Sequence, residues 1–264
     1  MIEAINICVQ RGKKQILNHV NIHAKSGALT VIIGPNGSGK STFIKALSGE
    51  IPYSGKMTLN GLDIAQTKAY KMAMMRAVLP QSTTLAFPFL VYEVVELGLS
   101  INQLTMEKTE LQNLPQKALE YVGLSHYSNQ YYHKLSGGEQ ARVQLARVLC
   151  QIWKPVYSGI PRWMILDEPI ANLDIQHQLV VMDIAKDFAR RGGGVLAVLH
   201  DLNLAAHYAD KMILLKQGEI YCEGNVYDVL TTKNLRDAYH CSLTVSELPK
   251  GDIPFILPQT ASSL

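Results

Sequence analysis

One short run of residues constrains the fold of this chain more than any other feature. Residues 34–41 read Gly-Pro-Asn-Gly-Ser-Gly-Lys-Ser and match the spacing G-x-x-x-x-G-K-[ST] without a gap. The preceding run, Leu29–Ile33, is apolar and rich in β-branched residues, as expected for a strand buried on both faces. A helix is expected to begin near Ser41. A buried strand, a glycine-rich turn and a helix in this order predict an α/β sheet with a phosphate-binding turn.

The residue types of this loop suit a phosphate chain. Glycines let backbone N–H groups approach phosphate oxygens without an obstructing Cβ atom, and the helix start presents its positive dipole end to the same anion. Lys40 is expected to reach the β- and γ-phosphates, and the Ser41 hydroxyl is a candidate Mg²⁺ ligand. A plain glycine-rich turn is the competing interpretation, which the flanking strand and helix disfavour. The candidate nucleotide-binding residues are Gly34, Pro35, Asn36, Gly37, Ser38, Gly39, Lys40, Ser41 and Thr42.

Two acidic residues follow a second apolar run, Trp163–Leu166. At the carboxyl end of a buried strand they lie where open α/β sheets bind their ligands. Asp167 is suited to hold Mg²⁺, directly or through water, and Glu168 is suited to accept a proton from an attacking water. A strand that ends in Asp-Glu more often marks a solvated edge, so this assignment depends on the phosphate loop upstream.

The rest of the pattern predicts one domain over residues 1–264. Residues 2–33 are expected to form short strands of an N-terminal antiparallel β subdomain, with turns at residues 11–12 and 25–27. Hairpin chemistry returns near Ser54-Gly55 and Asn60-Gly61. Further buried strands alternate with helices and imply a mainly parallel sheet. The other expected elements are strands at 195–199 and 212–215, helices at about 175–190 and 202–209, an inserted helical subdomain at about 88–155, and a surface loop at 150–161.

Composition excludes several classes of protein. A formal net charge of +3 without basic blocks argues against a nucleic-acid binder. No apolar run approaches the roughly 18 residues of a membrane span, and no secretory signal is expected. The four cysteines, which are far apart in sequence, are expected to be buried and reduced. A role at a membrane would therefore depend on another subunit.

Residues 135–140 read Leu-Ser-Gly-Gly-Glu-Gln. Ser136 and Glu139 have the spacing of a helix capping box. Between a phosphate loop and a Leu-Asp-Glu-Pro strand, however, this run resembles the signature of the ABC ATPase family. Gln81 in Leu-Pro-Gln resembles the Q-loop glutamine of that family, residues 171–174 (Ala-Asn-Leu-Asp) resemble its D-loop, and His200 resembles its switch histidine.

The resemblance covers nearly the whole chain and implies a P-loop NTPase fold and a head-to-tail homodimer. It implies that the phosphate loop of one subunit and the signature of the other enclose each ATP. Glu168, His200 and Gln81 then have catalytic roles, and Mg²⁺ is bound by Ser41, Gln81 and Asp167. It also implies two transmembrane permease subunits, a peripheral location on the cytoplasmic face of the bacterial inner membrane, and no nucleic-acid partner. The additional nucleotide contacts are Ser136, Gly137, Gly138 and Asp174.

The resemblance leaves three features open: the adenine contact, the D-loop and the role of residues 85–89. Many relatives carry an adenine-stacking aromatic near the end of the first strand, whereas this chain has Arg11, which either stacks instead or faces solvent. The D-loop reads Ile170-Ala171-Asn172 where relatives often have Thr-Ser-Ala, which leaves the communication between the two ATP sites open. Residues 85–89 (Leu-Ala-Phe-Pro-Phe) are interpreted either as a permease contact or as core.

The cargo is inferred from resemblance alone. Residues 76–81, 85–89, 94–98 and 199–206 resemble ATPases of heme importers, which implies a periplasmic heme-binding protein as an indirect partner. The ATPases of iron-siderophore and cobalamin importers have similar sequences in these segments, and they remain the alternative. A soluble ABC ATPase lacks support, because the chain has neither a second cassette nor a long coiled-coil insertion. A small-molecule kinase would have no use for the signature, and a regulator that does not hydrolyse ATP would not need Glu168.

Overall fold

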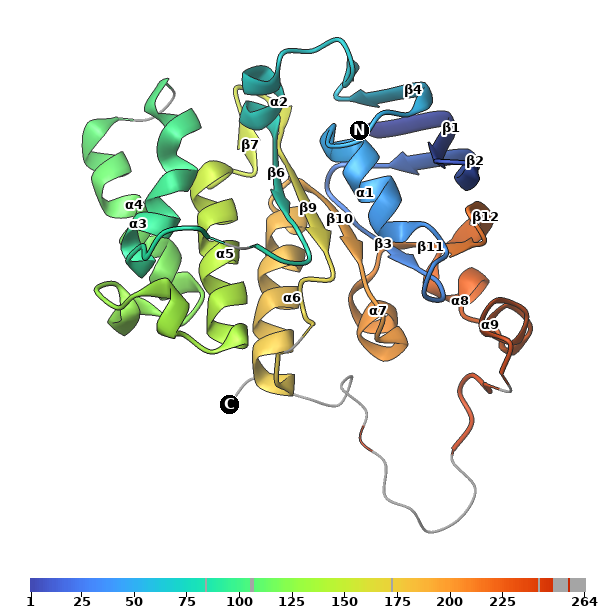
Figure 1. Ribbon diagram of the computed structural model, residues 1–264. Helices are drawn as coiled ribbons and strands as arrows, with labels where there is room; N and C mark the ends of the chain where they lie inside the picture. Colours follow the sequence, from blue (N-terminus) through green and yellow to red (C-terminus); the bar gives the residue numbers. More distant parts are fainter. Residues whose placement is uncertain (84, 105–106, 172, 242, 249–255, 257–264) are drawn as a thin grey trace.

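The computed structural model describes residues 1–83, 85–104, 107–171, 173–241, 243–248 and 256, with residues 102–104 described for the backbone only. A six-stranded sheet of order β12-β11-β3-β10-β9-β6 forms its centre, with helices on both faces (Figure 1). All neighbours pair in parallel except the hairpin of β11 and β12. The strands are β3 (Leu29–Ile33), β6 (Arg76–Leu79), β9 (Trp163–Asp167), β10 (Gly194–Val198), β11 (Lys211–Lys216) and β12 (Glu219–Gly224).

The three middle strands confirm the prediction of a buried parallel sheet. Every residue of β3, β9 and β10 is buried. Helices cover both faces of a parallel sheet, so its strands need apolar residues at every position rather than at alternate ones. Strands β6 and β12 were not predicted, because β6 is only four residues long and every second residue of β12 is exposed. The apolar run of β6 is therefore too short to indicate a strand, and β12 has no continuous apolar run.

A second sheet packs beside the first and has the order β2-β1-β4-β5, with antiparallel pairing throughout. The predicted antiparallel subdomain is confirmed, but its strands are longer than expected: β1 spans Ile2–Arg11 and β2 spans Lys14–Ala24. The expected turn at Ser54-Gly55 is wrong, because these residues begin strand β4 (Ser54–Leu59). The true hairpin turn is Asn60-Gly61, which has positive φ at both residues and leads into β5 (Leu62–Asp63).

The helical subdomain is inserted between β6 and β9 and lies on the left in Figure 1. Its longest helix, α5, begins at the signature and packs against the three other main elements of the subdomain. The apolar side chains between them join the core that also covers one face of the central sheet. The elements are α3 (Val91–Glu96), the 3₁₀ segments η1 (Leu97–Leu104), η2 (Ser125–Tyr127) and η3 (Tyr132–Lys134), α4 (Lys108–Tyr121) and α5 (Gly137–Gln151).

The expected surface loop at 150–161 is wrong. Residue 150 belongs to α5, and two short strands, β7 (Val156–Tyr157) and β8 (Ile160–Pro161), form a hairpin. Ser158 and Gly159 both have positive φ, which is the backbone that a two-residue hairpin turn requires. The sequence pattern did not indicate a hairpin, since each strand is only two residues long.

Six further helices complete the fold. Helices α6 and α7 were predicted, whereas α2, α8 and α9 were not; α9 is at the right-hand edge of Figure 1. No helix in the described ranges is long and apolar enough to cross a bilayer. No two of the four cysteines, all of which lie in described segments, form a disulfide. The prediction that they are buried holds only for Cys150, because Cys8 and Cys222 are half-buried and Cys241 is exposed. These helices are α1 (Lys40–Ser48), α2 (Ala69–Met75), α6 (Ile175–Arg190), α7 (Leu202–Tyr208), α8 (Val226–Val229) and α9 (Thr232–Tyr239).

Candidate active site

The predicted site residues of the core follow four neighbouring parallel strands. The phosphate loop follows β3, His200 follows β10, Asp167 ends β9 with Glu168 directly after it, and Gln81 follows β6. The carboxyl ends of parallel strands meet at one edge of a sheet, so residues from positions 34 to 200 converge there. The sheet order therefore assembles these side chains although the chain separates them widely.

The phosphate loop has a backbone that glycine makes possible. Gly34, Gly37 and Gly39 have φ of 148°, 77° and 107°. A Cβ atom at Gly34 would overlap the carbonyl oxygen of Leu215 on β11, and one at Gly39 would lie 2.6 Å from the Leu17 side chain. Strands β11 and β2 thus lie so close to the loop that a side chain at either glycine would collide with them.

Two polar groups of the loop are suited to bind an anion. The Ser38 hydroxyl is buried and has no hydrogen-bond partner among the described residues. The Lys40 ammonium donates to the carbonyl oxygens of Gly34 at 2.8 Å and Pro35 at 3.0 Å, so it lies inside the loop itself. Burial lowers the pKa of Lys40, while Glu168 and Asp167 oppose that shift. A bound phosphate would supply the negative charge that this buried cation needs.

Ser41 and Asp167 form a pair suited to a divalent cation. The Ser41 hydroxyl donates to Asp167 Oδ1 at 3.1 Å, and Asp167 is 3% exposed. Burial raises the pKa of Asp167, since the hydrogen bond from Ser41 compensates only part of the lost hydration. A hydroxyl beside a buried carboxylate is the hard oxygen donor set that Mg²⁺ prefers. The residues present therefore fit that ion.

Glu168 is held between the two other predicted catalytic residues. Its Oε2 accepts a hydrogen bond from Gln81 Nε2 at 2.8 Å, and its Oε1 lies 2.6 Å from His200 Nε2. The backbone of Glu168 has φ 55°, a left-handed conformation that costs a non-glycine residue about 1–2 kcal/mol. The carboxylate contacts residues that follow the two strands on either side of β9, namely β6 and β10.

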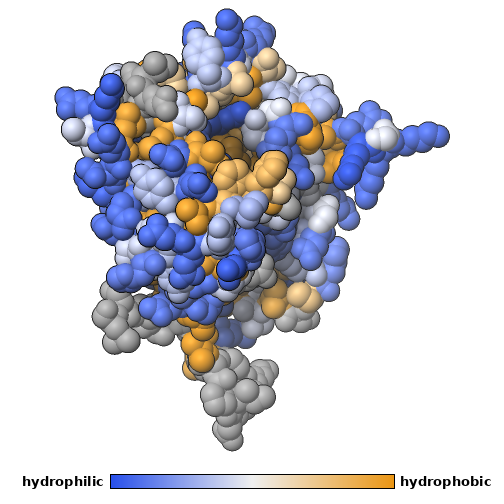
Figure 2. Space-filling view, turned by 60° about the vertical axis from the view of Figure 1, so that its left-hand side comes forward, coloured by the Kyte–Doolittle hydropathy of each residue, from blue (hydrophilic) through white to orange (hydrophobic). Residues whose placement is uncertain are grey.

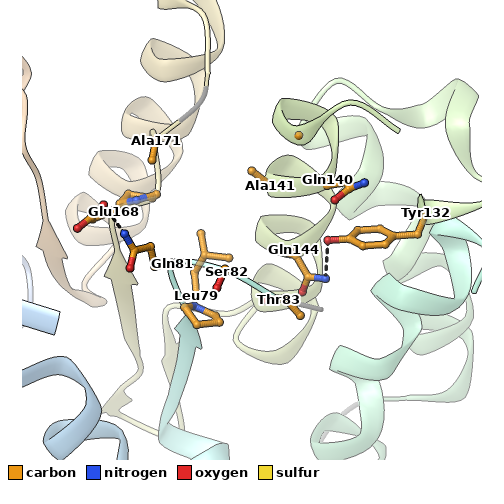
Figure 3. A pocket seen from close by; sticks show the side chains of 13 residues that line it. Leu79, Gln81, Ser82, Thr83, Tyr132, Gln140, Ala141, Gln144, Glu168 and Ala171 are labelled. Atoms are coloured by element: carbon orange, nitrogen blue, oxygen red, sulfur yellow. Dashed lines mark hydrogen bonds between the residues drawn. The ribbon is translucent and has the colours of Figure 1, made fainter. Parts of the chain in front are cut away.

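A cleft of about 210 Å³ separates this carboxylate from the helical subdomain (Figure 3). Gln81 and Glu168 lie on one side, and Gln140, Gln144 and Tyr132 lie on the other. Tyr132 accepts a hydrogen bond from Gln144 Nε2 at 3.2 Å. Tyr132 and Gln144 were not predicted as site residues, although the spacing of Gln140 and Gln144 would place both on one helix face.

The signature and the D-loop lie apart from the phosphate loop within one chain. The predicted capping box is confirmed, because Ser136 Oγ accepts from Glu139 N at 3.3 Å and Glu139 accepts from Ser136 N at 2.8 Å. Ser136 and Gly137 are exposed at the start of α5, with Gly138 half-buried behind them. Asp174 caps helix α6, where it accepts from His177 N at 2.9 Å. Their free surfaces would suit a nucleotide held by a second subunit.

Three remaining predictions have different outcomes. Arg11 is exposed at the end of β1, so its contact with adenine stays a prediction, and Asn172 of the D-loop lies outside the described residues. For residues 85–89 the core interpretation is confirmed at two positions, and the permease contact stays a prediction. Leu85 and Phe89 pack against the core, whereas Phe87 is 72% exposed.

The fold and this site together define a nucleotide-hydrolysing ATPase cassette. Residues 17–171 match the family described as ABC transporter, which is more than half of the chain, and the chain therefore belongs to the ABC transporter family. It binds ATP as the family does, and it is an ATP-hydrolysing transporter subunit.

Curated relatives are similar to this chain over its full length and share one more specific name. The chain is 81% identical to the "Hemin import ATP-binding protein HmuV" of Bartonella quintana (strain Toulouse), over 100% of each chain. It is 49% identical to the protein of the same name from Mesorhizobium japonicum, over 99% of each. Among solved structures, the dimeric ATP-binding cassette MJ0796 in a post-hydrolysis state with ADP and Pi is 25% identical, with a TM-score of 0.71, over 86% of this chain and 99% of that one.

Proposed function

We propose that this chain is the ATPase subunit that powers hemin import through a membrane permease. The observation that carries the proposal is the 81% identity over full length to a hemin import ATP-binding protein. The geometry of the site supports the ATPase part of the proposal independently. A carboxylate lies beside the candidate nucleotide site between two hydrogen-bonding partners.

In the proposed reaction, Glu168 accepts the proton of the water that attacks the γ-phosphate. His200 and Gln81 orient the carboxylate and the water, because each already contacts one oxygen of Glu168. Lys40 exchanges its two loop carbonyls for phosphate oxygens, and Ser38 gains the partner that its buried hydroxyl lacks in the described structure. The bond between the γ-phosphorus and its bridging oxygen breaks, and ADP and phosphate leave.

Mg²⁺ would be held by Ser41 and Asp167, with Gln81 as the third protein group. When bound, it neutralises charge on the β- and γ-phosphates. The Ser41–Asp167 pair at 3.1 Å supports this assignment, since it places two oxygen donors next to each other. Gln81 is exposed and contacts Glu168 instead, so its role at the metal requires the Q-loop to move.

A homodimer would complete each ATP site. Ser136, Gly137 and Gly138 of one subunit face outward, and together with Asp174 they would close on the phosphate loop of the other subunit. A helix start with free N–H groups suits the γ-phosphate, as the phosphate loop already does from the opposite side. The exposed signature of the single chain supports this arrangement, and the dimeric form of the 25% identical cassette is consistent with it.

The permease would dock beside the cleft between the Q-loop and the helical subdomain. Phe87 is 72% exposed and its ring is edge-on to Phe89 at 6.3 Å. Figure 2, in which the helical side of the molecule comes forward, shows apolar patches in the middle of this face with hydrophilic residues around them. Apolar surface in water costs roughly 25 cal/mol per Å², which favours a covering partner. Two such permease subunits would anchor the dimer to the cytoplasmic face of the inner membrane.

Reconstitution tests the cargo directly. The chain, its permease and the periplasmic heme-binding protein would be combined in proteoliposomes, and uptake of hemin, a ferric siderophore and cobalamin would be measured with ATP inside. We expect hemin uptake that depends on ATP and that the Glu168→Gln variant lacks. Preferential uptake of cobalamin or of the siderophore would assign that cargo to the transporter instead of hemin. Phosphate release without uptake of any of the three would contradict the transport role.

A further inference from the structure

The segment 168–174 joins the candidate base Glu168 to helix α6. It leaves β9 at the carboxyl end of that strand, and α6 then returns the chain toward β10 (Figure 1). Ile170 and Leu173 of the segment are buried in the core, whereas Asp174 at its end is exposed. The segment is therefore anchored along its length and presents a carboxylate at the edge where the proposed subunit contact would form.

Two hydrogen bonds converge on one oxygen of Asp174. Its Oδ1 accepts from the backbone N–H of His177 at 2.9 Å and lies 2.7 Å from Nδ1 of the His177 ring. An ionised carboxylate can only accept hydrogen bonds, so the ring carries its proton on Nδ1 in this contact. The backbone and ring bonds hold the pKa of Asp174 below its usual range. The carboxylate is therefore ionised at neutral pH.

The second oxygen of Asp174 has no such contact. Within the part of the chain that the structure describes, Oδ2 takes part in no hydrogen bond or ion pair, and the side chain is 65% exposed. Capping of α6 requires only the bond from the backbone N–H of His177. The ring contact is an addition to the cap. It fixes the plane of the carboxylate and, with it, the direction of Oδ2.

Gln178 braces the same segment from the next position of α6. Its Nε2 donates to the carbonyl oxygen of Leu173 at 3.1 Å and lies 3.5 Å from that of Ile170. The first turn of α6 thus holds both the backbone of the segment and the carboxylate at its end. A side chain that is already held in one conformation loses less entropy when it binds a partner. His177 and Gln178 have no part in the proposed reaction itself.

We propose that His177 is a positioning residue that holds Asp174 in the conformation in which it binds the second subunit of the ATP-bound dimer. The inference rests on the homodimer of the proposed function. Asp174 Oδ2 accepts a hydrogen bond from an N–H or hydroxyl group of the second subunit, because phosphate oxygens would repel a carboxylate. The dimer is two-fold symmetric, so the contact forms twice and its loss counts twice.

ATP-driven dimerisation of the Glu168→Gln chain tests this role, since that variant should bind ATP without consuming it. Sedimentation with ATP and Mg²⁺ would give the dimer Kd. Adding His177→Phe keeps a ring but removes the donor, and it should raise the dimer Kd about tenfold. Adding His177→Asn places an amide nitrogen where Nδ1 lies, and it should restore the dimer to within about twofold. A purely structural role of the ring predicts the reverse order.

A double-mutant cycle shows whether His177 acts through Asp174. Asp174→Ser keeps a residue that caps helices well but removes the second oxygen, so His177→Phe should have no further effect in that background. Gln176→Ala is the matched control, because Gln176 is an exposed neighbour on the same helical turn. It should dimerise like the Glu168→Gln chain. The affinity of the isolated chain for ADP should be the same in all variants.

The outcomes separate this inference from the proposed homodimer. Equal dimer Kd values with histidine and phenylalanine at position 177, or a His177→Phe effect that persists in the Asp174→Ser background, would overturn the inference alone. A loss of ADP affinity in His177→Phe would place the ring in the nucleotide site and would also overturn it. A Glu168→Gln chain that remains monomeric with ATP would contradict the homodimer and, with it, the positioning role.

Discussion

The Nε2 atom of His200 lies 2.6 Å from the Oε1 atom of Glu168, although 32 residues separate them in the chain. Strands β9 and β10 are parallel neighbours, and each of the two residues follows one of them. Together with Gln81, His200 occupies both oxygens of the carboxylate. These two contacts make Glu168 the candidate base of the site.

The Glu168→Gln variant should bind ATP with nearly normal affinity and hydrolyse it ~10²–10⁴-fold more slowly. The amide preserves the shape and the contact with Gln81, but it cannot accept a proton from water. Steady-state phosphate release and nucleotide binding would be measured side by side. Turnover equal to that of the unaltered chain would assign the base to another group, with His200 the next candidate.

The Lys40→Ala variant should lose measurable ATP binding or hydrolysis. Lys40 is 5% exposed and is the cation nearest to the loop carbonyls, so no other side chain replaces its charge at the phosphates. The Lys56→Ala variant is the control, because Lys56 is an exposed lysine on β4. If Lys40→Ala hydrolyses ATP normally, the phosphate-loop assignment is wrong.

The Asp167→Asn variant should lose ATPase activity and yet melt at a higher temperature than the unaltered chain when both lack nucleotide and Mg²⁺. Burial raises the pKa of Asp167 above its ordinary value of 3.8, so the ionised form destabilises the folded chain. Each kcal/mol of relief would raise Tm by about 2–4 °C.

The size of this effect depends on pH. Asp167 is protonated in both states well below pH 3.8, so the variant should gain nothing there. As pH rises through the raised pKa of the folded state, the unaltered chain loses stability and the variant does not. The gain should therefore be largest near neutral pH, as thermal melts at several pH values would show. Equal melting temperatures at neutral pH would mean that the buried charge is already compensated.

The Phe87→Asp and Phe89→Asp variants should behave differently. Phe87 is 72% exposed, so its replacement should leave folding and soluble ATPase activity intact while abolishing copurification with the permease. Phe89 packs against the core, so its replacement should lower stability by roughly 2–3 kcal/mol. Thermal melts and copurification separate the two outcomes. Normal copurification and hemin uptake by Phe87→Asp would place the docking surface elsewhere.

Much of the fold could be predicted because the deciding signals are local in sequence. The run Leu29–Ile33 is apolar at every position, and only a strand covered on both faces tolerates that pattern. The glycine spacing of residues 34–41 belongs to a loop whose backbone other residues cannot adopt, as the positive φ angles of its three glycines show. The capping box of α5 likewise depends only on four consecutive residues, 136–139.

Tertiary structure alone decided what these segments bring together. No local pattern distinguishes Phe87 from Phe89, and only tertiary packing leaves Phe87 exposed while Phe89 is half-buried against the core. The contact between Gln81 and Glu168 depends on β6 lying next to β9, which follows from pairing between strands 87 residues apart rather than from either strand's composition. The sequence by itself determined the chemical groups and the local backbone, because these depend on residues close in the chain. Their distances and burial were decided by the pairing of distant strands, because pairing and packing depend on the whole sheet.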